Sequence, residues 1–352
     1  MTNIDQSNQI ISLDRISDIC GVSIGTVSKA LSGKPGVRST TRQRILSVAE
    51  RYRYRPNRLV HAIQRGKSMT VGLTCRNFGD EFGGRIMSGM LEVLFHAKYD
   101  PIVISWELSV NEGVRALRSL TERRVDGILM FPPAELPTDP YLEELRIFNG
   151  PIVVVDQMWP GCRYDFYGSQ DAEGADVVTE HLIKLGHRKI AHIQLSNVST
   201  GQSRLDGFQR AMIRHGIAIH EKWLPGIEHY GSDEPYKIAR ELLSSPDRPT
   251  AIVAFNDPVA MQVLAAAHDL GLRVPQDLSV TGFGDLDVTR HLRPMLTTVA
   301  QNPMAIGRKA AERLLQQIEA NSTAPGHPVS SPLQELLPVE VIVRQSTGPI
   351  SR

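Results

Sequence analysis

Residues 13–31, LDRISDICGVSIGTVSKAL, decide the fold of the N-terminal part of the chain. Before Gly21 the apolar residues recur at helical spacing, so one face of a first helix can be buried. These residues are Leu13, Ile16, Ile19 and Cys20. Gly21 follows this helix and suits a reversal of the chain, because glycine adopts a positive φ without steric cost. The stretch therefore predicts two short helices joined by a tight turn.

The second helix is predicted to start at Ser23, a residue type that caps helix N-termini. Val27 and Leu31 lie one turn apart and should pack on the first helix, where Ser17 is small enough to allow a close approach. The opposite face carries short polar groups and one cation: Gly25, Thr26, Ser28 and Lys29. A helix-turn-helix presents such a face to the DNA major groove. The alternative is a helical hairpin with a solvated outer face.

A third amphipathic helix is predicted after Ser39 and before Pro56. Its apolar stripe comprises Ile45, Val48, Ala49 and Tyr52. Residues 55–68, RPNRLVHAIQRGKS, form another short helical pattern that Gly66 closes. The predicted organisation is a three-helix module over 11–55, a linker that can become a helix over 56–68, and a core over 69–345.

Charge is distributed unevenly along the 352 residues. The whole chain has 39 Lys and Arg against 38 Asp and Glu. Residues 1–68 hold 12 against 4, a net charge of +8, which leaves 27 against 34, a net of −7, for the remainder. A basic N-terminal region on an acidic body is typical of a polyanion-binding module attached to another domain.

Cysteine usage and hydropathy exclude several classes of protein. The three cysteines, Cys20, Cys75 and Cys162, are too few and too widely spaced for a disulfide framework or a metal motif. We therefore expect no cofactor and no metal. No signal peptide and no run of 18 apolar residues is visible, so we expect a cytosolic protein that does not contact a membrane.

After residue 69 strands alternate with helices, the pattern of parallel sheets with crossover helices. The predicted strands are Thr70–Thr74, Ile102–Ser105, Gly127–Phe131, Ile152–Asp156, Lys189–Gln194, Ala251–Phe255, Leu278–Phe283 and Pro338–Arg344. The predicted helices are Arg85–Ala97, Asn111–Arg123, Ala172–Leu185, Ser203–His215, Pro258–Leu270 and Pro303–Ala320. Two doubly wound α/β units follow, and the sheet edges where their strands end are the usual ligand sites.

The N-terminal motifs GVSIGTVSKALSG and RYRYRPNRLVHAIQRGKS, followed by a strand beginning TVGL, resemble the lactose-repressor (LacI/GalR) family of bacterial transcription regulators. Five later motifs keep the family order: HLIKLGHRKIAHI, SRLDGFQRAM, PTAIVAFND, LGLRVPQDLSVTGFGD and PMLTTVAQ. The resemblance implies an all-α helix-turn-helix head and a two-lobed α/β core of the periplasmic-binding-protein type, with ligand between the lobes. The match is looser at Cys75–Gly84, a loop that lines the ligand cleft in the family.

The resemblance also assigns roles in DNA binding. Ile24, Gly25 and Lys29 match the positions where the family reads bases, and Lys29 can donate to guanine. Ser23, Thr26 and Ser28 are assigned to the same surface, with Thr26 and Ser28 toward phosphate. In the linker the assigned residues are Asn57, Arg58 and Ile63. Ile63 stands where relatives place a leucine that wedges into the minor groove and kinks the DNA; alternatively it only packs on Leu59.

Ligand contacts carried over from the family are Phe82, Asp156, Arg204, Asn256, Asp257 and Gln301. Arg204 offers a rigid fork of donors suited to hydroxyls, carboxylate or phosphate, unless it pairs with Asp206 or another carboxylate. Gly284 departs from the family pattern, which has an aspartate there, and the adjacent Asp285 should point elsewhere. This set favours a sugar, sugar acid or sugar phosphate, and the lost acceptor favours an anionic ligand.

Enzymes are the main alternative class, because doubly wound folds host many of them. The sequence lacks a G-x-G-x-x-G, a P-loop, H-E-x-x-H and G-x-S-x-G. Four aspartates follow strands, Asp156, Asp171, Asp257 and Asp285, and such carboxylates bind sugar hydroxyls as readily as they catalyse. A free-standing solute-binding protein is a third possibility, which the basic head and the missing signal peptide disfavour. We expect no catalytic residues.

The sequence thus predicts a ligand-responsive regulator that binds palindromic operator DNA, most often as a repressor of carbohydrate-metabolism genes. The alternative within the family is an activator or dual regulator with a non-sugar effector. Two-fold DNA sites imply a two-fold protein, so we expect a homodimer. Gln345–Arg352 contains Gly and Pro and no leucine heptad, which disfavours the tetramers that some relatives form.

Overall fold

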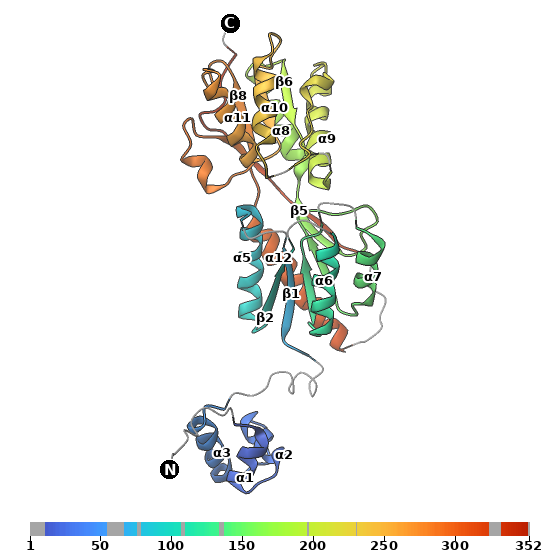
Figure 1. The fold of residues 1–352 in the computed structure, drawn as a ribbon, viewed down its shortest axis with the longest axis vertical. Helices are drawn as coiled ribbons and strands as arrows, with labels where there is room; N and C mark the ends of the chain where they lie inside the picture. The colour runs from blue at the N-terminus through green and yellow to red at the C-terminus, as the bar shows by residue number, and fades with distance from the viewer. Residues whose placement is uncertain are drawn as a thin grey trace, which may run out of the picture. The chain divides into compact units, whose positions relative to one another are not determined.

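The computed structural model describes residues 11–54, 67–75, 79–106, 110–133, 137–195, 197–229, 231–323 and 332–350. The chain forms two compact units, of which the first ends at Ser68 and the second begins at Met69. Figure 1 shows helices in the described part of the first unit and two α/β lobes in the second.

The first unit confirms the two short helices and the turn between them. They are α1 (Leu13–Cys20) and α2 (Ile24–Leu31), and α3 (Ser39–Arg51) follows. Gly21 ends α1 with a φ of 56°, the left-handed conformation that glycine adopts freely. Ser23 caps α2, because its hydroxyl accepts a hydrogen bond from the backbone N–H of Thr26 at 3.2 Å.

A small core holds the three helices together. Ile16, Val27 and Ile45, one from each helix, are fully buried. Two predictions for this core are wrong. Ile19 is 43% exposed, because Cys20 takes the inward position at the end of α1, and Tyr52 is 45% exposed, because α3 has already ended.

Lobe 1 of the second unit is built on a six-stranded parallel sheet in the order β10-β5-β4-β3-β1-β2. Its strands are β1 (Thr70–Cys75), β2 (Asp100–Ser105), β3 (Gly127–Met130), β4 (Ile152–Val155), β5 (Asp165–Ser169) and β10 (Gln334–Leu337). Its helices are α5 (Glu81–His96), α6 (Val110–Glu122), α7 (Asp139–Ile147) and α12 (Pro303–Thr323). Separate buried clusters place α5 and α12 on one face of the sheet and α6 and α7 on the other.

Lobe 2 contains a five-stranded sheet in the order β11-β9-β8-β7-β6, in which only β11 is antiparallel. Its strands are β6 (Ile190–Ile193), β7 (Ala251–Ala254), β8 (Ser279–Gly284), β9 (Thr297–Ala300) and β11 (Glu340–Ile342). Its helices are α8 (Asp171–Lys184), α9 (Ser199–Arg214), α10 (Glu234–Ser244) and α11 (Asp257–Asp269), with short 3-10 helices η1 (Glu221–Trp223) and η2 (Asp287–Arg290). Helices α8 and α9 cover one face, and α10 and α11 the other.

The chain crosses between the lobes three times in the described part. The crossings lie between β5 and α8, between β9 and α12, and between β10 and β11. The predicted fold class, a helical head with two α/β lobes, is therefore confirmed.

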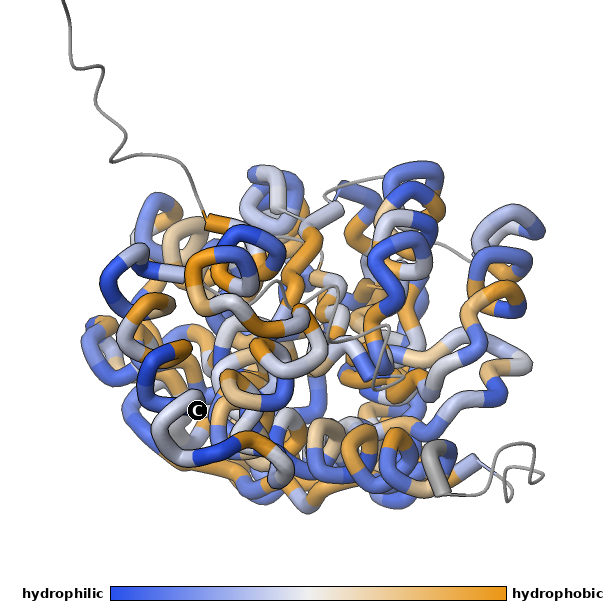
Figure 2. The backbone as a smooth tube through the Cα atoms, turned by 90° about the horizontal axis from the view of Figure 1, so that it is seen from below, coloured by the Kyte–Doolittle hydropathy of each residue, from blue (hydrophilic) through white to orange (hydrophobic). Residues whose placement is uncertain are grey.

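Hydropathy follows this layering. The helices in Figure 2 alternate hydrophobic and hydrophilic residues along their turns, as helices buried on one side must. None of the described helices is both long enough and apolar enough to span a bilayer.

The packing of α5 on α12 can be tested through two glycines of α5. A methyl group at Gly89 would overlap the backbone oxygen of Met304, whereas one at Gly84 would meet open space. We expect Gly89→Ala to lower the free energy of unfolding by about 1–3 kcal/mol, because backbone atoms must move apart. Gly84→Ala should raise it by up to about 1 kcal/mol through helix propensity. Urea denaturation measures both, and equal effects would contradict the close approach.

Candidate functional site

One pocket lies between the lobes, at the carboxyl ends of the sheet strands. Five of the six residues assigned to ligand line it: Phe82, Asp156, Arg204, Asn256 and Gln301. The remaining lining residues are Asp80, Gln157, Leu195, Thr200, Phe255, Pro258, Phe283, Gly284 and Leu286. The sixth assigned residue, Asp257, lies outside this lining.

Arg204, on α9, is held by the protein itself. Its Nε and Nη2 donate to the same oxygen of Asp171, at 2.8 and 2.7 Å, and Nη1 donates to the backbone oxygen of Phe255 at 2.7 Å. The guanidinium carbon also lies 3.8 Å from the centre of the Phe283 ring, a cation–π contact. Two of its five N–H groups are left by these bonds, so Arg204 can still donate into the pocket.

The partner of Arg204 is a buried carboxylate of lobe 2. The side chains of Arg204 and Asp171 are 6% and 7% exposed. Burial raises the pKa of Asp171, and the charge of Arg204 acts against that rise. The alternative considered for Arg204, an ion pair with a carboxylate, is thus realised with Asp171, whereas Asp206 accepts from Gln202. Arg204 therefore reaches the pocket with its charge largely compensated.

Asp257 is fully buried at the start of α11. Its carboxylate accepts hydrogen bonds from the Thr298 hydroxyl at 2.5 Å and from the backbone N–H of Leu286 at 2.8 Å. Burial raises its pKa to about 6, although these two donors favour the charged form. Its contacts join α11, β9 and the segment after β8, so it stabilises segments that border the pocket.

Gly284 lines the pocket without a side chain, and Asp285 does not replace the missing acceptor. The Asp285 carboxylate binds Arg344 at 2.5 Å and Arg290 at 3.3 Å. Only one of the four aspartates that follow strands, Asp156, thus reaches the pocket. Asp156 has a φ of 67°, and its backbone N–H donates to Tyr167 on β5 at 3.0 Å. A strained non-glycine residue in a pocket wall is a frequent feature of functional sites.

The pocket walls are tied together by contacts between the lobes. Arg85 on α5 binds Asp287 of η2 at 2.6 Å, and the backbone N–H of Asp287 donates to Glu81 at 3.1 Å. Gln301 donates to Ser169 at 2.7 Å, where two of the chain crossings meet. The hydrogen bond from the Met158 N–H to Ser199 adds another link. Closing or opening the lobes must rearrange these contacts.

The second candidate surface is the outer face of α2. Ile24 is 46% exposed, and Gly25 and Lys29 are also exposed. The hydroxyl of Ser23 caps the helix and lies 2.9 Å from that of Thr26, so both are partly used within the module. Ser28 is half-buried. The face therefore offers Ile24 and Lys29 as its projecting side chains, with a bare backbone at Gly25.

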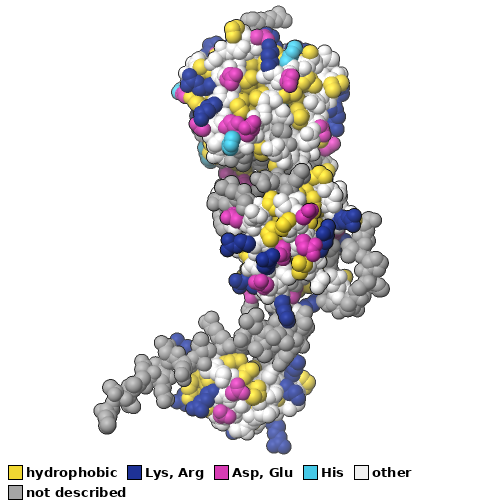
Figure 3. All heavy atoms as spheres, turned by 45° about the vertical axis from the view of Figure 1, so that its right-hand side comes forward, with side chains coloured by type: hydrophobic (Ala, Val, Ile, Leu, Met, Phe, Trp, Pro, Cys, Tyr) yellow, Lys and Arg dark blue, Asp and Glu magenta, His cyan; other side chains and the backbone are white. Residues whose placement is uncertain are grey.

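Figure 3 shows Lys and Arg side chains, together with a few Asp and Glu side chains, on the visible side of the helical module. Arg44 donates to the backbone oxygen of Cys20 at 2.5 Å, and Arg42 donates to that of Lys34. Within residues 11–54 no Lys or Arg forms an ion pair with a carboxylate. The positive charge of the module is therefore uncompensated, as phosphate binding requires.

Asn57, Arg58 and Ile63, assigned to the linker, lie outside the described residues. Sequence reasoning also missed part of the pocket. Phe255 and Phe283 stand at the ends of β7 and β8, a position that could have marked them. Asp80 caps α5 by accepting from the Phe82 N–H at 3.1 Å, and its neighbour Phe82 was the only residue of this turn to be predicted. The pairing of Asp171 with Arg204 has no local sequence signal.

Two family models match parts of the chain. Residues 12–57 match the family model of bacterial regulatory proteins of the lacI family, and residues 179–347 match the periplasmic binding protein-like domain. The HTH-type transcriptional repressor PurR of Photobacterium profundum is 28% identical over 305 residues, which are 86% of this chain and 91% of that protein.

Solved structures show the same fold. A Lac repressor dimer bound to operator and the anti-inducer ONPF is 23% identical, with a TM-score of 0.84 over 97% of this chain and all of that one. A LacI family regulator from Enterococcus faecium with bound ribose is 26% identical, with a TM-score of 0.68 over 80% of this chain and all of that one.

The buried carboxylate of Asp257 should make stability depend on pH. Its pKa is about 6 in the folded chain, above the ordinary value of about 4 for an aspartate, so the folded state holds more protons between these pH values. Its contribution to stability therefore falls as the pH rises from about 4 to about 6. Asp257→Asn removes this titration. Any hydrogen bond lost in the variant changes the free energy of unfolding by the same amount at every pH.

We expect the free energy of unfolding of Asp257→Asn, relative to the parent chain, to increase by on the order of 2 kcal/mol between pH 4 and pH 7. Urea denaturation at several pH values measures the difference. Asp287→Asn is the matched control with the opposite sign, because Arg85 lowers the pKa of Asp287. A difference that is independent of pH would contradict the buried state of Asp257.

Proposed function

Because the chain belongs to the lacI family of bacterial regulatory proteins, we propose that it is a cytoplasmic repressor whose hold on operator DNA is controlled by a neutral, polyhydroxylated small molecule. The family consists of transcription regulators and not of enzymes. The two candidate surfaces supply the two activities, DNA binding by α2 and effector binding between the lobes. The observation that carries the effector class is the pairing of Arg204 with Asp171.

The charge in and around the pocket favours a neutral ligand. Arg204 is the one cation among the described residues that line it, and Asp80 and Asp156 are its carboxylates. Since Asp171 compensates the charge of Arg204, this guanidinium contributes little net positive charge to attract a sugar acid or a sugar phosphate. Carboxylates and the remaining N–H groups of Arg204 suit hydroxyls. This revises the expectation of an anionic ligand that the sequence favoured.

Effector control requires that the two lobe arrangements bind the effector differently. The cross-lobe contacts of Arg85 with Asp287 and of Gln301 with Ser169 flank the pocket, so a ligand that draws the lobes together also changes these contacts. We propose that this movement resets the spacing of two linkers in a homodimer, with Ile63 of each linker at the centre of a palindromic operator. Repression of carbohydrate-metabolism genes fits a sugar effector.

The proposed base-reading surface predicts a specific effect of Lys29. In Lys29→Ala the module keeps its fold, because Lys29 is exposed, but loses a donor to guanine that is worth about 1–3 kcal/mol. We expect the operator preference to relax at one base pair in each half-site, measured by selection from random DNA. Lys34→Ala removes the same charge after α2 and should weaken all sequences alike. Unchanged preferences in Lys29→Ala would contradict the assignment.

The effector class is tested by calorimetry with neutral sugars and with the matching sugar acids and sugar phosphates. We expect the tightest ligand to be neutral. In Asp171→Asn the affinity for the sugar acid should rise relative to that for the neutral sugar, because Arg204 then carries an uncompensated charge. Glu173→Gln, on the same helix and 52% exposed, is the control and should leave the preference unchanged. A tightest ligand that is anionic in the parent chain would overturn the neutral class.

A further inference from the structure

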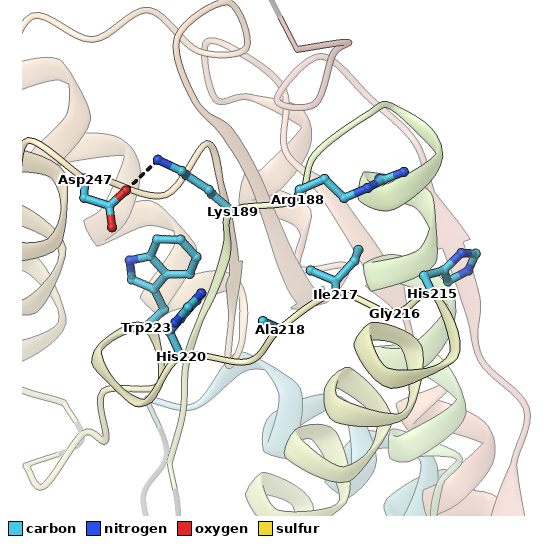
Figure 4. Close-up of a pocket in the computed structure, with 9 residues that line it drawn as sticks. All are labelled: Arg188, Lys189, His215, Gly216, Ile217, Ala218, His220, Trp223 and Asp247. Carbon is cyan, nitrogen blue, oxygen red and sulfur yellow. Dashed lines mark hydrogen bonds and ion pairs between the residues drawn. The ribbon is translucent and has the colours of Figure 1, made fainter.

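A second hollow, of about 340 Å³, lies on lobe 2 away from the effector pocket. It borders the residues that precede β6 and β7, namely Lys189 and Asp247, whereas the effector pocket borders Leu195 and Phe255, which follow these strands. The two sites thus lie at opposite ends of the same strands. Figure 4 shows the hollow, with Trp223 of η1 near one end and His215 near the other.

One end of the hollow holds a carboxylate between two lysines. Lys189 and Lys222 bind different oxygens of Asp247, at 2.5 and 2.6 Å, and their hydrogen bonds lower the pKa of Asp247 to about 2. Two ammonium groups thus share one carboxylate, which leaves a net positive charge. Lys222 also lies 5.4 Å from the centre of the Trp223 ring. This end offers both donors and an acceptor, as a polar, hydroxylated group requires.

The other end is formed by Arg188. Its Nη1 donates to the backbone oxygens of Ile183 and His187, each at 3.0 Å. Carbonyl groups orient the guanidinium but do not cancel its charge, and no carboxylate of the described chain forms an ion pair with it. The bonds to the carbonyls use only Nη1, and a guanidinium fork matches the geometry of phosphate oxygens. Arg188 is therefore a fixed, uncompensated cation at the rim of the hollow.

Between the two ends the floor is apolar and backbone-lined. Figure 4 shows Lys189 directed toward Asp247 and Arg188 directed to the opposite side, with Ile217 and Ala218 between them. A ligand that spans the hollow thus meets a cation at one end, a small apolar surface in the middle and mixed polar groups at the other end.

We propose that this hollow binds a phosphorylated small molecule, with its phosphate on Arg188 and its organic part over Ile217 toward Lys189 and Asp247. Such a site would let lobe 2 respond to a second, anionic ligand while the effector pocket selects a neutral one. The proposal does not depend on the effector class, because the two sites share no lining residue.

Calorimetry on the full-length protein with inorganic phosphate, glucose 6-phosphate and glucose as probes tests this site. We expect glucose 6-phosphate to bind, inorganic phosphate to bind more weakly, and Arg188→Gln to reduce both affinities at least tenfold. Lys189→Gln should weaken only the sugar phosphate. Equal affinity for the two phosphates would identify free phosphate as the ligand and would overturn the role given to the organic part.

The matched control is Arg240→Gln, which removes the same charge from α10 of lobe 2, where Arg240 contacts Tyr236 outside the hollow. It should leave both affinities unchanged. Equal losses in Arg188→Gln and Arg240→Gln would show unspecific attraction to a basic surface and would overturn the proposal. Binding that survives in Arg188→Gln, or no binding to the parent chain at millimolar concentration, would also overturn it.

Discussion

The buried ion pair of Arg204 with Asp171 is the interaction on which the effector pocket depends. It joins α9 to the start of α8, and the same guanidinium binds the backbone oxygen of Phe255 after β7 and stacks on Phe283 of β8. Removing one partner of such a pair leaves an unpaired buried charge and costs about 3–5 kcal/mol. A residue that lines the pocket is thus also a structural connection between four elements.

Asp171 also stands at a chain crossing, two residues after Ser169 of lobe 1, and this position links the pocket to lobe movement. Ser169 accepts from Gln301, which follows β9 at the next crossing. The residues that fix Arg204 therefore neighbour the segments that must bend when the lobes move. Because the pocket and the chain crossings share neighbouring residues, a ligand in the pocket can change the relative populations of two lobe arrangements.

The sequence predicted those elements whose apolar residues recur at helical spacing or form an unbroken run, whereas β5 and β9 are buried but contain polar residues. Helices α1, α2 and α8 and strands such as β4 have the expected periodicity or an unbroken apolar run. Strands β5, β9 and β10 and helices α7 and α10 were not predicted. The sequence of β10, QELL, shows no strand pattern, because it is an edge strand whose residues are largely exposed. For the site, sequence position places a residue at a strand end but does not give the direction of its side chain. Asp171, Asp257 and Asp285 all follow strands. In the structure they turn to Arg204, Thr298 and Arg344, respectively, and not into the pocket.

Charge compensation separates the structural cations of this chain from those available to ligands. Most arginines of the second unit whose side chains form hydrogen bonds or ion pairs bind carboxylates, as Arg204 and Arg344 do. In the helical module Arg42 and Arg44 instead bind backbone oxygens, which fix the side chain without cancelling its charge. A polyanion gains the full attraction of such cations and releases counterions on binding. The positive charge of the module surface is therefore not neutralised by ion pairs among residues 11–54. Arg42 and Arg44 are oriented by neutral partners, and this arrangement leaves their charge available to a polyanion.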